Sequence, residues 1–414
     1  MRKTLILILL CYASFAQAQL SPAITAWIQN PDTTTHKGYG NIPSNCIKIQ
    51  YSTSDVYVSC FCIPGYSIGP WNNPNVAENQ NFVYKITLNP QKNTGTPTTI
   101  GLGHIGVLTN GVSIFNANDA QFENHVWSRN GYYFEFPSFD NCIGHPQQQG
   151  EYHHHVSPKC LYDQTDSTHH SPIIGYMFDG FPVYGAYGYA DTNGTGGIKR
   201  MRSSYRLRAD ESRTKDPWGN TGAYPGPALD TVPMGYLLWD WEYVPGLGDL
   251  DSANGRWCVT PEYPNGTYAY FMTLDSTLAP AYPYTSAGSY YGVVQSGNIG
   301  MGPGSSGGHN TITVPTTVYV DTVATGVSTV ESEISFKIVP NPTAAYVYVY
   351  MDNNSVNNVT GKLYNEAGQM LQDIGYMQPT IAYTLDLTKY AAGIYLLRMT
   401  DGKSETVKKI VKAN

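Results

Sequence analysis

No stretch of this chain repeats apolar residues with the period of about 3.6 that marks an amphipathic helix. Short runs that favour strands appear instead, for example Phe82–Leu88 and Tyr268–Met272. The 414 residues include 34 Tyr, 41 Gly and 27 Pro, a composition that favours short strands joined by many turns. We therefore predict a mostly β protein.

The N-terminal segment has the features of a secretory signal. The basic pair Arg2-Lys3 precedes an apolar run, residues 5–10, and Ala16-Gln17-Ala18 has the pattern of a cleavage site. We expect residues 1–18 to be removed as a signal peptide. Elsewhere the sequence does not approach the roughly 18 consecutive apolar residues of a membrane helix, so we expect no transmembrane segment in the mature chain.

A change in composition divides the remaining chain. Residues 297–333 are rich in Gly, Ser, Thr and Val, which predicts a flexible linker. Residues 334–414 then contain about seven short strand-like runs, such as Ala345–Tyr350, which predict a small β-sandwich. Residues 19–296 are assigned to a larger β-rich domain.

The C-terminal segment resembles a known family in four places: Val339-Pro340-Asn341-Pro342-Thr343, the turn at residues 365–369, the strand Ala392–Tyr395 and the basic end Lys408–Lys412. It is similar to the C-terminal sorting domain of type IX secretion cargo in Bacteroidetes. The resemblance implies handling by the type IX secretion machinery and removal of the domain, followed by release or attachment to surface lipopolysaccharide. The expected location is secreted or on the outer-membrane surface of a Bacteroidetes-type bacterium.

The histidines are concentrated in one short segment. Six of the ten lie within 26 residues, in His145, Tyr152-His153-His154-His155 and His169-His170. If the second group lies on a strand, His153 and His155 point to one face and His154 to the other. Imidazole is a common ligand for zinc and copper and a common proton shuttle near neutral pH, so we expect the chemistry of the protein here.

We predict a copper or zinc site formed by His145, His153 and His155, with His170 or Asp179 as a fourth group. Two other interpretations remain open. The histidines and Asp179 could satisfy one another in a buried hydrogen-bonded network, or they could perform metal-free acid–base catalysis.

The histidine segment also belongs to an ordered series of motifs that resembles the YHYH domain family. The series comprises Ile105–Val112, Asp140-x-Cys142-x-Gly144-His145-Pro146, Tyr152–His155, His170–Gly185, Asp249–Arg256 and Thr260–Tyr268. The second tyrosine of the family's name motif is His154 here. The resemblance implies a fold and the position of a site, but no activity.

Six cysteines follow the signal, an even number that predicts disulfides in an exported chain. We expect Cys142 to pair with Cys160 around the histidine segment, and Cys46 to pair with Cys60 or Cys62. The formal charge of −7 excludes the basic surface that nucleic-acid binding requires.

Two further features are weaker. Asp249, Asp251 and Asn254 could supply oxygen ligands to calcium, although the same pattern forms an ordinary Asx turn. Aromatic residues such as Trp218, Trp239 and Trp241 could stack on sugars.

The sequence therefore predicts a secreted or cell-surface YHYH-domain protein that binds a transition metal. The alternatives are a secreted hydrolase or oxidase that uses the same histidines, and a glycan-binding or adhesive surface protein. Whether the protein is an enzyme is left open.

Overall fold

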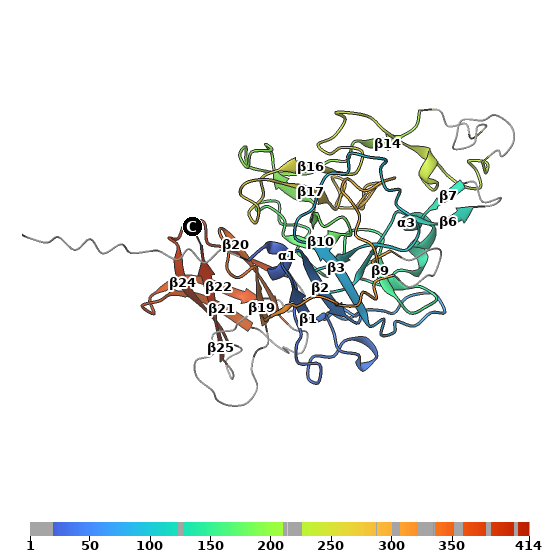
Figure 1. Cartoon of the computed structure of the whole chain (residues 1–414). Coiled ribbons are helices and arrows are strands. Elements are labelled where there is room, and N and C mark those ends of the chain that lie inside the picture. Colours follow the sequence, from blue (N-terminus) through green and yellow to red (C-terminus); the bar gives the residue numbers. More distant parts are fainter. Residues whose placement is uncertain are drawn as a thin grey trace, which may run out of the picture.

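The computed structural model describes residues 20–122, 127–209, 213, 226–286, 288–299, 307–320, 334, 336–351, 359–377, 382–400 and 405–413. The predicted signal peptide lies outside the described residues. Short strands dominate the rest, which confirms the predicted mostly β fold (Figure 1).

The largest sheet has eight strands in the order β16-β17-β11-β10-β4-β5-β9-β8. In chain order these are β4 (His104–Leu108), β5 (Ser113–Phe115), β8 (His145–Pro146), β9 (Tyr152–His154), β10 (Ile173–Met177), β11 (Pro182–Tyr184), β16 (Gly255–Cys258) and β17 (Thr267–Phe271). Strands β4, β10 and β17 are buried along their whole length, as expected for strands covered on both faces. The histidine-bearing strands β9 and β8 form one edge of this sheet.

A second sheet has four strands in the order β18-β1-β2-β3. Their bounds are Cys46–Tyr51 for β1, Asp55–Cys60 for β2, Phe82–Thr87 for β3 and Thr317–Tyr319 for β18.

Strand β18 lies within the predicted linker of residues 297–333, of which 300–306 and 321–333 lie outside the described residues. Residues 307–320 lie along this sheet: Tyr319 pairs with Ile49, and the backbone N–H of Val83 donates to the carbonyl of Gly308 at 2.6 Å. Backbone groups can pair with an open sheet edge without apolar side chains, so a composition rich in Gly, Ser and Thr did not reveal the strand.

Small two-stranded sheets and short helices complete this part of the fold. Three two-stranded sheets pair β6 (Asn118–Phe122) with β7 (Trp127–Asn130), β12 (Tyr187–Tyr189) with β13 (Ile198–Arg200), and β14 (Tyr205–Leu207) with β15 (Trp241–Tyr243). The helices are α1 (Pro22–Thr25), α3 (Gly131–Glu135), η1 (Tyr39–Asn41), η2 (Phe136–Ser138) and η3 (Leu238–Asp240). None of the helices in the described part of the chain is long and apolar enough to span a membrane.

One apolar core joins the two main sheets. Trp27, Ile49, Val107, Tyr176 and Phe271 all belong to it, and each is at most 1% exposed. The core therefore collects side chains from distant parts of the sequence, which fixes the sheets relative to each other.

The C-terminal strands, orange to red in Figure 1, form a separate sandwich. One sheet contains β19 (Phe336–Val339), β20 (Tyr346–Met351) and β23 (Tyr383–Asp386), and the other contains β22 (Met370–Met377), β21 (Val359–Asn365), β24 (Gly393–Thr400) and β25 (Glu405–Lys412). Phe336, Leu363 and Leu397 are fully buried in a core of their own. The predicted β-sandwich is confirmed.

The sandwich also touches the rest of the protein. The hydroxyl of Tyr348 donates to the carbonyl of His170 at 2.9 Å, and the ring of Tyr346 meets that of His169 edge-on at 5.1 Å. The C-terminal domain is therefore packed against the body that carries the histidines.

The cysteines agree with the sequence prediction only in part. Cys142 and Cys160 form a disulfide, as predicted. Cys46, Cys60 and Cys62 are free and buried, so the expected second bridge is wrong. Cys46 lies opposite Cys60 in the β1–β2 ladder, but its thiol turns to the carbonyl of Thr109, whereas that of Cys60 turns to Gly111.

Candidate metal centre

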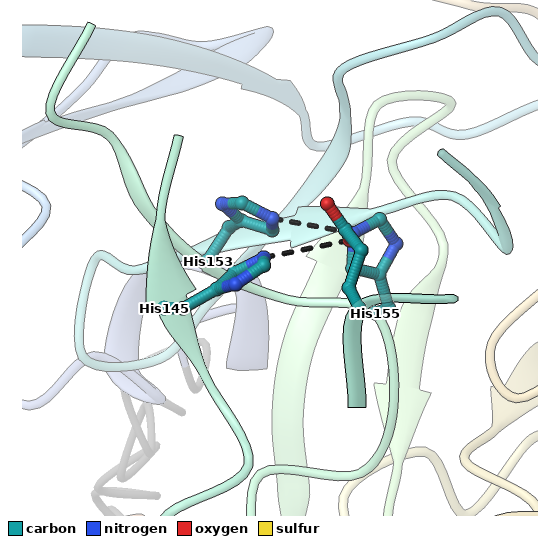
Figure 2. A group of neighbouring side chains, drawn as sticks. His145, His153 and His155 are labelled. Carbon is teal, nitrogen blue, oxygen red and sulfur yellow. Dashed lines mark hydrogen bonds and ion pairs between the residues drawn. The ribbon is translucent and has the colours of Figure 1, made fainter. Parts of the chain in front are cut away.

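Three of the predicted ligands meet at the edge of the large sheet. His145 in β8 lies directly opposite His153 in β9, and neighbouring side chains on one face of an antiparallel pair contact each other. His155 follows β9 and, two residues after His153, points to the same side. The three residues are 3%, 1% and 2% exposed, respectively. Figure 2 shows their rings converging.

Glu135, the last residue of α3, completes the cluster. Its Oε2 lies 2.6 Å from Nε2 of His155 and 3.4 Å from Nε2 of His145. One ligand atom from each of the four residues lies within 4.8 Å of the others. No sequence motif marks Glu135 as a ligand; its one distinguishing sign is that it is the single charged residue in the aromatic segment 130–139.

The two residues predicted as a fourth ligand, His170 and Asp179, are not part of this cluster. His170 packs between aromatic rings, 4.9 Å from that of Tyr184. Asp179 follows β10, which is separated from β9 by β4 and β5. Three strand spacings of about 4.8 Å put its carboxylate out of reach of the cluster.

His154 points to the other side of β9, as the strand period predicts. Its Nδ1 lies 2.8 Å from the carbonyl oxygen of Ile143, and its Nε2 lies 3.2 Å from the hydroxyl of Tyr66. Burial lowers the pKa of His154 to about 4. This histidine is therefore a neutral, buried hydrogen-bonding residue outside the cluster.

Backbone carbonyl groups outside the cluster orient the rings of His153 and His155 through their Nδ1 atoms. Nδ1 of His153 lies 3.0 Å from the carbonyl oxygen of Glu151, and Nδ1 of His155 lies 2.5 Å from that of Asn116. A carbonyl oxygen only accepts hydrogen bonds, so each Nδ1 must carry the proton. In their neutral forms, which a metal ion requires, both rings would therefore present unprotonated Nε2 atoms to the centre.

His145 is oriented by a hydroxyl. The Oγ of Ser138 donates to the carbonyl of Glu135 at 2.8 Å, so it accepts from Nδ1 of His145, 2.6 Å away. The amide nitrogen of Asn73 lies farther from the same Nδ1, at 3.3 Å, and makes the weaker contact. Nε2 of His145 also faces the centre, 3.4 Å from Oε2 of Glu135. Outer contacts that fix the tautomer in this way are typical of metal-bound histidines.

The nitrogen and oxygen atoms that face one another in the cluster are stabilised by a positive charge between them. Nε2 of His153 and Nε2 of His155 are 3.2 Å apart, a distance at which two lone pairs repel unless a proton or a cation lies between them. Burial alone would raise the pKa of Glu135, but the positive charge of His155 and the hydrogen bonds of His145 and His155 hold it well below its usual range. The group is therefore an anionic carboxylate facing nitrogen donors.

The two closest imidazoles differ in basicity. Burial, followed by the charges of His145 and His155, lowers the pKa of His153 well below its ordinary value. Burial would also lower the pKa of His155, but Glu135 raises it above its ordinary value. Without a metal, the proton of the cluster therefore resides between His155 and Glu135, where a divalent ion would replace it.

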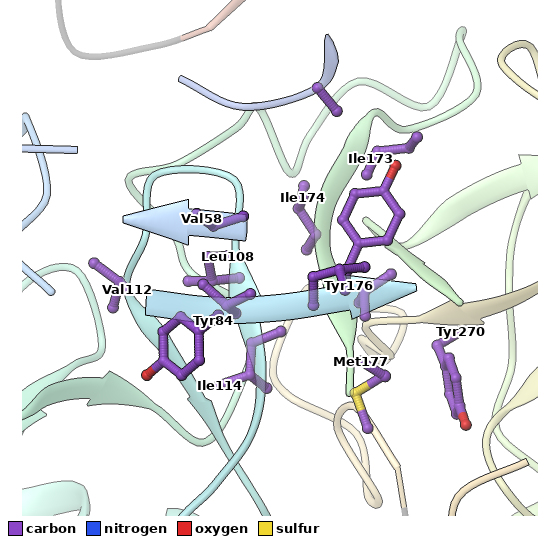
Figure 3. Close-up of a cluster of buried hydrophobic side chains, with 14 of the residues drawn as sticks. Val58, Tyr84, Leu108, Val112, Ile114, Ile173, Ile174, Tyr176, Met177 and Tyr270 are labelled. Carbon is purple, nitrogen blue, oxygen red and sulfur yellow. The ribbon is translucent and has the colours of Figure 1, made fainter. Parts of the chain in front are cut away.

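Packing fixes the strand that carries His153. Strand β9 runs parallel to β5, where Ser113 pairs with His153 and the fully buried Ile114 belongs to the core in Figure 3. The carboxylate of Glu151 accepts from Ser113 Oγ at 2.5 Å and lies 2.8 Å from Nδ1 of His104. This buried network secures the residue whose carbonyl orients His153.

The cluster lies in the wall of a cavity of about 490 Å³. The side chain of Glu135 is 23% exposed, whereas the imidazoles are almost completely covered. An ion held by these residues would therefore be accessible from one side.

Removing the hydroxyl that orients His145 tests the role of these outer contacts. Ser138→Ala should weaken copper or zinc binding about 10–100-fold, because His145 loses the acceptor that fixes its tautomer. Competition with a chromophoric chelator measures the change. Ser138→Thr keeps the hydroxyl and should bind like the wild type; equal affinity in all three proteins would contradict this role.

Asp179 has a structural role with a measurable pH dependence. Its carboxylate accepts hydrogen bonds from Tyr270 at 2.6 Å and from the N–H of Gly292 at 2.8 Å, yet burial raises its pKa from 3.8 to about 6. The folded protein therefore holds the proton of Asp179 more tightly than the unfolded chain does. The resulting contribution to the unfolding free energy is complete below pH 3.8 and is lost as the pH rises through 6.

Wild-type protein should therefore lose on the order of 3 kcal/mol of unfolding free energy, relative to Asp179→Asn, between about pH 4 and about pH 7. Urea unfolding of both proteins across this range measures the difference. If the unfolding free energies of the two proteins changed with pH in the same way, the raised pKa of Asp179 would be contradicted.

The predicted calcium ligands have separate partners. Asp249 pairs with Lys199 at 2.9 Å, Asp251 accepts from the hydroxyl of Tyr268, and the amide of Asn254 donates to a backbone carbonyl. These side chains do not converge, so the structure gives the calcium prediction no support.

The tryptophans proposed for sugar stacking are packed against other side chains. The ring of Trp241 stacks on Tyr282 at 4.9 Å, and that of Trp239 is covered by Arg208 at 4.5 Å and meets Trp127 edge-on. Trp218 lies outside the described residues. The two described rings do not form a flat exposed platform.

Fold and site together define a mostly β protein with a histidine–carboxylate centre at a sheet edge and a separate C-terminal sandwich. Residues 83–283 match the family model described as YHYH protein, and residues 337–413 match the secretion system C-terminal sorting domain. The chain therefore carries a YHYH domain, which contains all four residues of the centre, and a sorting domain, as both resemblances predicted. No curated protein matches the chain.

The sorting domain identifies an exported protein, secreted or displayed on the outer surface of a Bacteroidetes-type bacterium and handled by the type IX secretion machinery. The centre is therefore built into a protein that works outside the cytoplasm.

Proposed function

We propose that this exported protein binds one transition metal ion, copper or zinc, through His145, His153, His155 and Glu135. The observation that carries the proposal is the arrangement of the three imidazoles. Each is anchored through Nδ1, and each directs Nε2 toward the same carboxylate.

The spacing of the donor atoms supports a pre-formed site. Ligand atoms about 2.0–2.1 Å from a tetrahedral ion lie roughly 3.3 Å from one another. The separations of 3.2 Å between His153 and His155 and of 3.4 Å between His145 and Glu135 are close to that value. The 2.6 Å between His155 and Glu135 is shorter and would lengthen when an ion replaces the proton between them. Small side-chain movements would therefore complete the coordination.

The chemistry of the donors narrows the choice of metal. Three imidazole nitrogens and one carboxylate oxygen, without a thiolate, suit zinc or copper(II) better than calcium, which prefers an all-oxygen set. The free thiols belong to other parts of the core and are absent from the four-residue group.

A second candidate function is a metal-dependent hydrolase or oxidase. The observation that favours it is the cavity beside the cluster, which would give a substrate access to the ion. When bound, the metal would act as a Lewis acid or a redox centre, while the histidines and Glu135 hold it in place.

The fate of the protein after export is also a proposal. The C-terminal domain has its own core and touches that of the YHYH domain through the partly buried Tyr350, so its removal would leave the buried residues of the YHYH core in place. We infer that the body is then released or attached to surface lipopolysaccharide.

Elemental analysis of the purified protein after exposure to Zn²⁺ or Cu²⁺ and dialysis tests the leading proposal. The expected content is about one ion per chain, together with a higher unfolding temperature. A folded protein that retains neither ion and gains no thermal stability would overturn the proposal.

Substitution of the carboxylate tests the composition of the site. Glu135→Gln should weaken metal binding by more than the 10–100-fold typical of outer contacts, because it removes the only anionic donor. Isothermal titration measures the affinity. The control Glu242→Gln alters a surface ion pair with Arg206 and should leave metal binding unchanged; equal losses in both variants would argue against a direct role for Glu135.

A further inference from the structure

The cavity beside the histidines has an unusual concentration of side-chain amides. Six carboxamides line it: Asn73, Asn75, Asn118, Gln147, Gln148 and Gln149. Apolar side chains are few in the lining, whereas pockets for apolar ligands are lined mostly by hydrophobic and aromatic residues. The cavity is therefore suited to a polar ligand.

Its charges do not favour an anion. Among the described residues that line it, none is Lys or Arg. Asp119 is paired with Arg129 at 2.9 Å, and Glu151 lies 2.8 Å from the imidazole of His104, so both carboxylates already have partners. Sites for phosphate or carboxylate ligands use Arg or Lys in direct contact, and here the metal would be the only such cation.

Part of the amide lining is rigid. The amides of Asn73 and Asn75 both donate to the carbonyl of Pro146, directly after His145, at 3.3 and 3.2 Å. Gln147 is tied to Glu151 by a contact of 3.4 Å. These contacts fix one wall of the cavity next to the centre, while Gln148 and Gln149 are exposed at its mouth.

We infer that this cavity binds an uncharged saccharide, held by the carboxamides with one or more hydroxyl groups directed at the metal; this rests on the proposed metal site. A carboxamide both donates and accepts hydrogen bonds, as a sugar hydroxyl does. Several neighbouring carboxamides can therefore form hydrogen bonds with the several hydroxyl groups of a sugar. The volume of about 490 Å³ lies in the range of small-molecule sites.

A glycan array that carries neutral and anionic oligosaccharides, probed with the metal-loaded full-length protein, tests the inference. Binding to neutral glycans is expected, and calorimetry with the best of them gives an affinity. Gln148→Ala combined with Gln149→Ala should weaken that affinity about tenfold or more without changing the metal content. Gln91→Ala, an exposed residue outside the cavity, serves as the matched control.

Metal content measured in every sample separates the two proposals. A protein that takes up no metal contradicts the metal-binding function. A protein that holds its metal but binds no glycan, or binds anionic glycans alone, contradicts the saccharide inference and leaves metal binding intact. Equal affinity in the wild type and the double variant would also overturn the inference, because the amides would then not contact the sugar.

Discussion

Replacing both His153 and His155 by alanine is expected to abolish stoichiometric uptake of copper or zinc. The double variant retains His145 and Glu135 alone, and two donors cannot hold a transition metal ion against dialysis. Elemental analysis measures the loss. In thermal or chemical unfolding, metal at about 100 times its dissociation constant should stabilise the wild type by about 2.7 kcal/mol and the double variant not at all.

The variant His154→Tyr is the matched control. It changes the intervening histidine, which faces Tyr66 on the other side of β9, and it restores the second tyrosine of the family's name motif. Metal uptake should persist. If the histidines form only a structural network, the wild type will take up no metal, and the double variant will lose stability that added metal never restores.

Deletion of residues 334–414 is expected to trap the protein in the periplasm. The deleted segment contains the whole match to the sorting domain, residues 337–413. Its core is separate from that of the YHYH body, so the truncated protein should still fold. Fractionation of cells into periplasm, outer membrane and medium measures the distribution.

Tyr348→Phe tests whether export depends on the sorting domain itself or on its packing against the rest of the protein. This substitution removes the hydrogen bond to the carbonyl of His170 but keeps the sorting domain, so export should continue. A truncated protein that reaches the cell surface or the medium at normal yield would refute the assigned role of the domain.

Part of the histidine cluster follows from the local sequence alone. His153 and His155 could be placed on one face, and His154 on the other, because the period of a strand is a property of neighbouring residues. His170 and Asp179 lie outside the cluster: His170 packs against Tyr184, and Asp179 follows β10, which β4 and β5 separate from β9. Glu135 joins the cluster from the end of α3. Its position depends on how β6, β7 and α3 pack beside the edge of the large sheet.

Sequence alone therefore determined the β class, the two resemblances, the Cys142–Cys160 bridge and three of the four residues at the centre. These depend on short-range periodicity and on motifs that are contiguous in the chain. The tertiary structure decided the fourth residue, the strand formed by 317–319, the free state of Cys46 and Cys60, and the shape of the cavity. Each of these depends on backbone pairing or packing between segments far apart in sequence, whose relative positions are set only when the shared core forms.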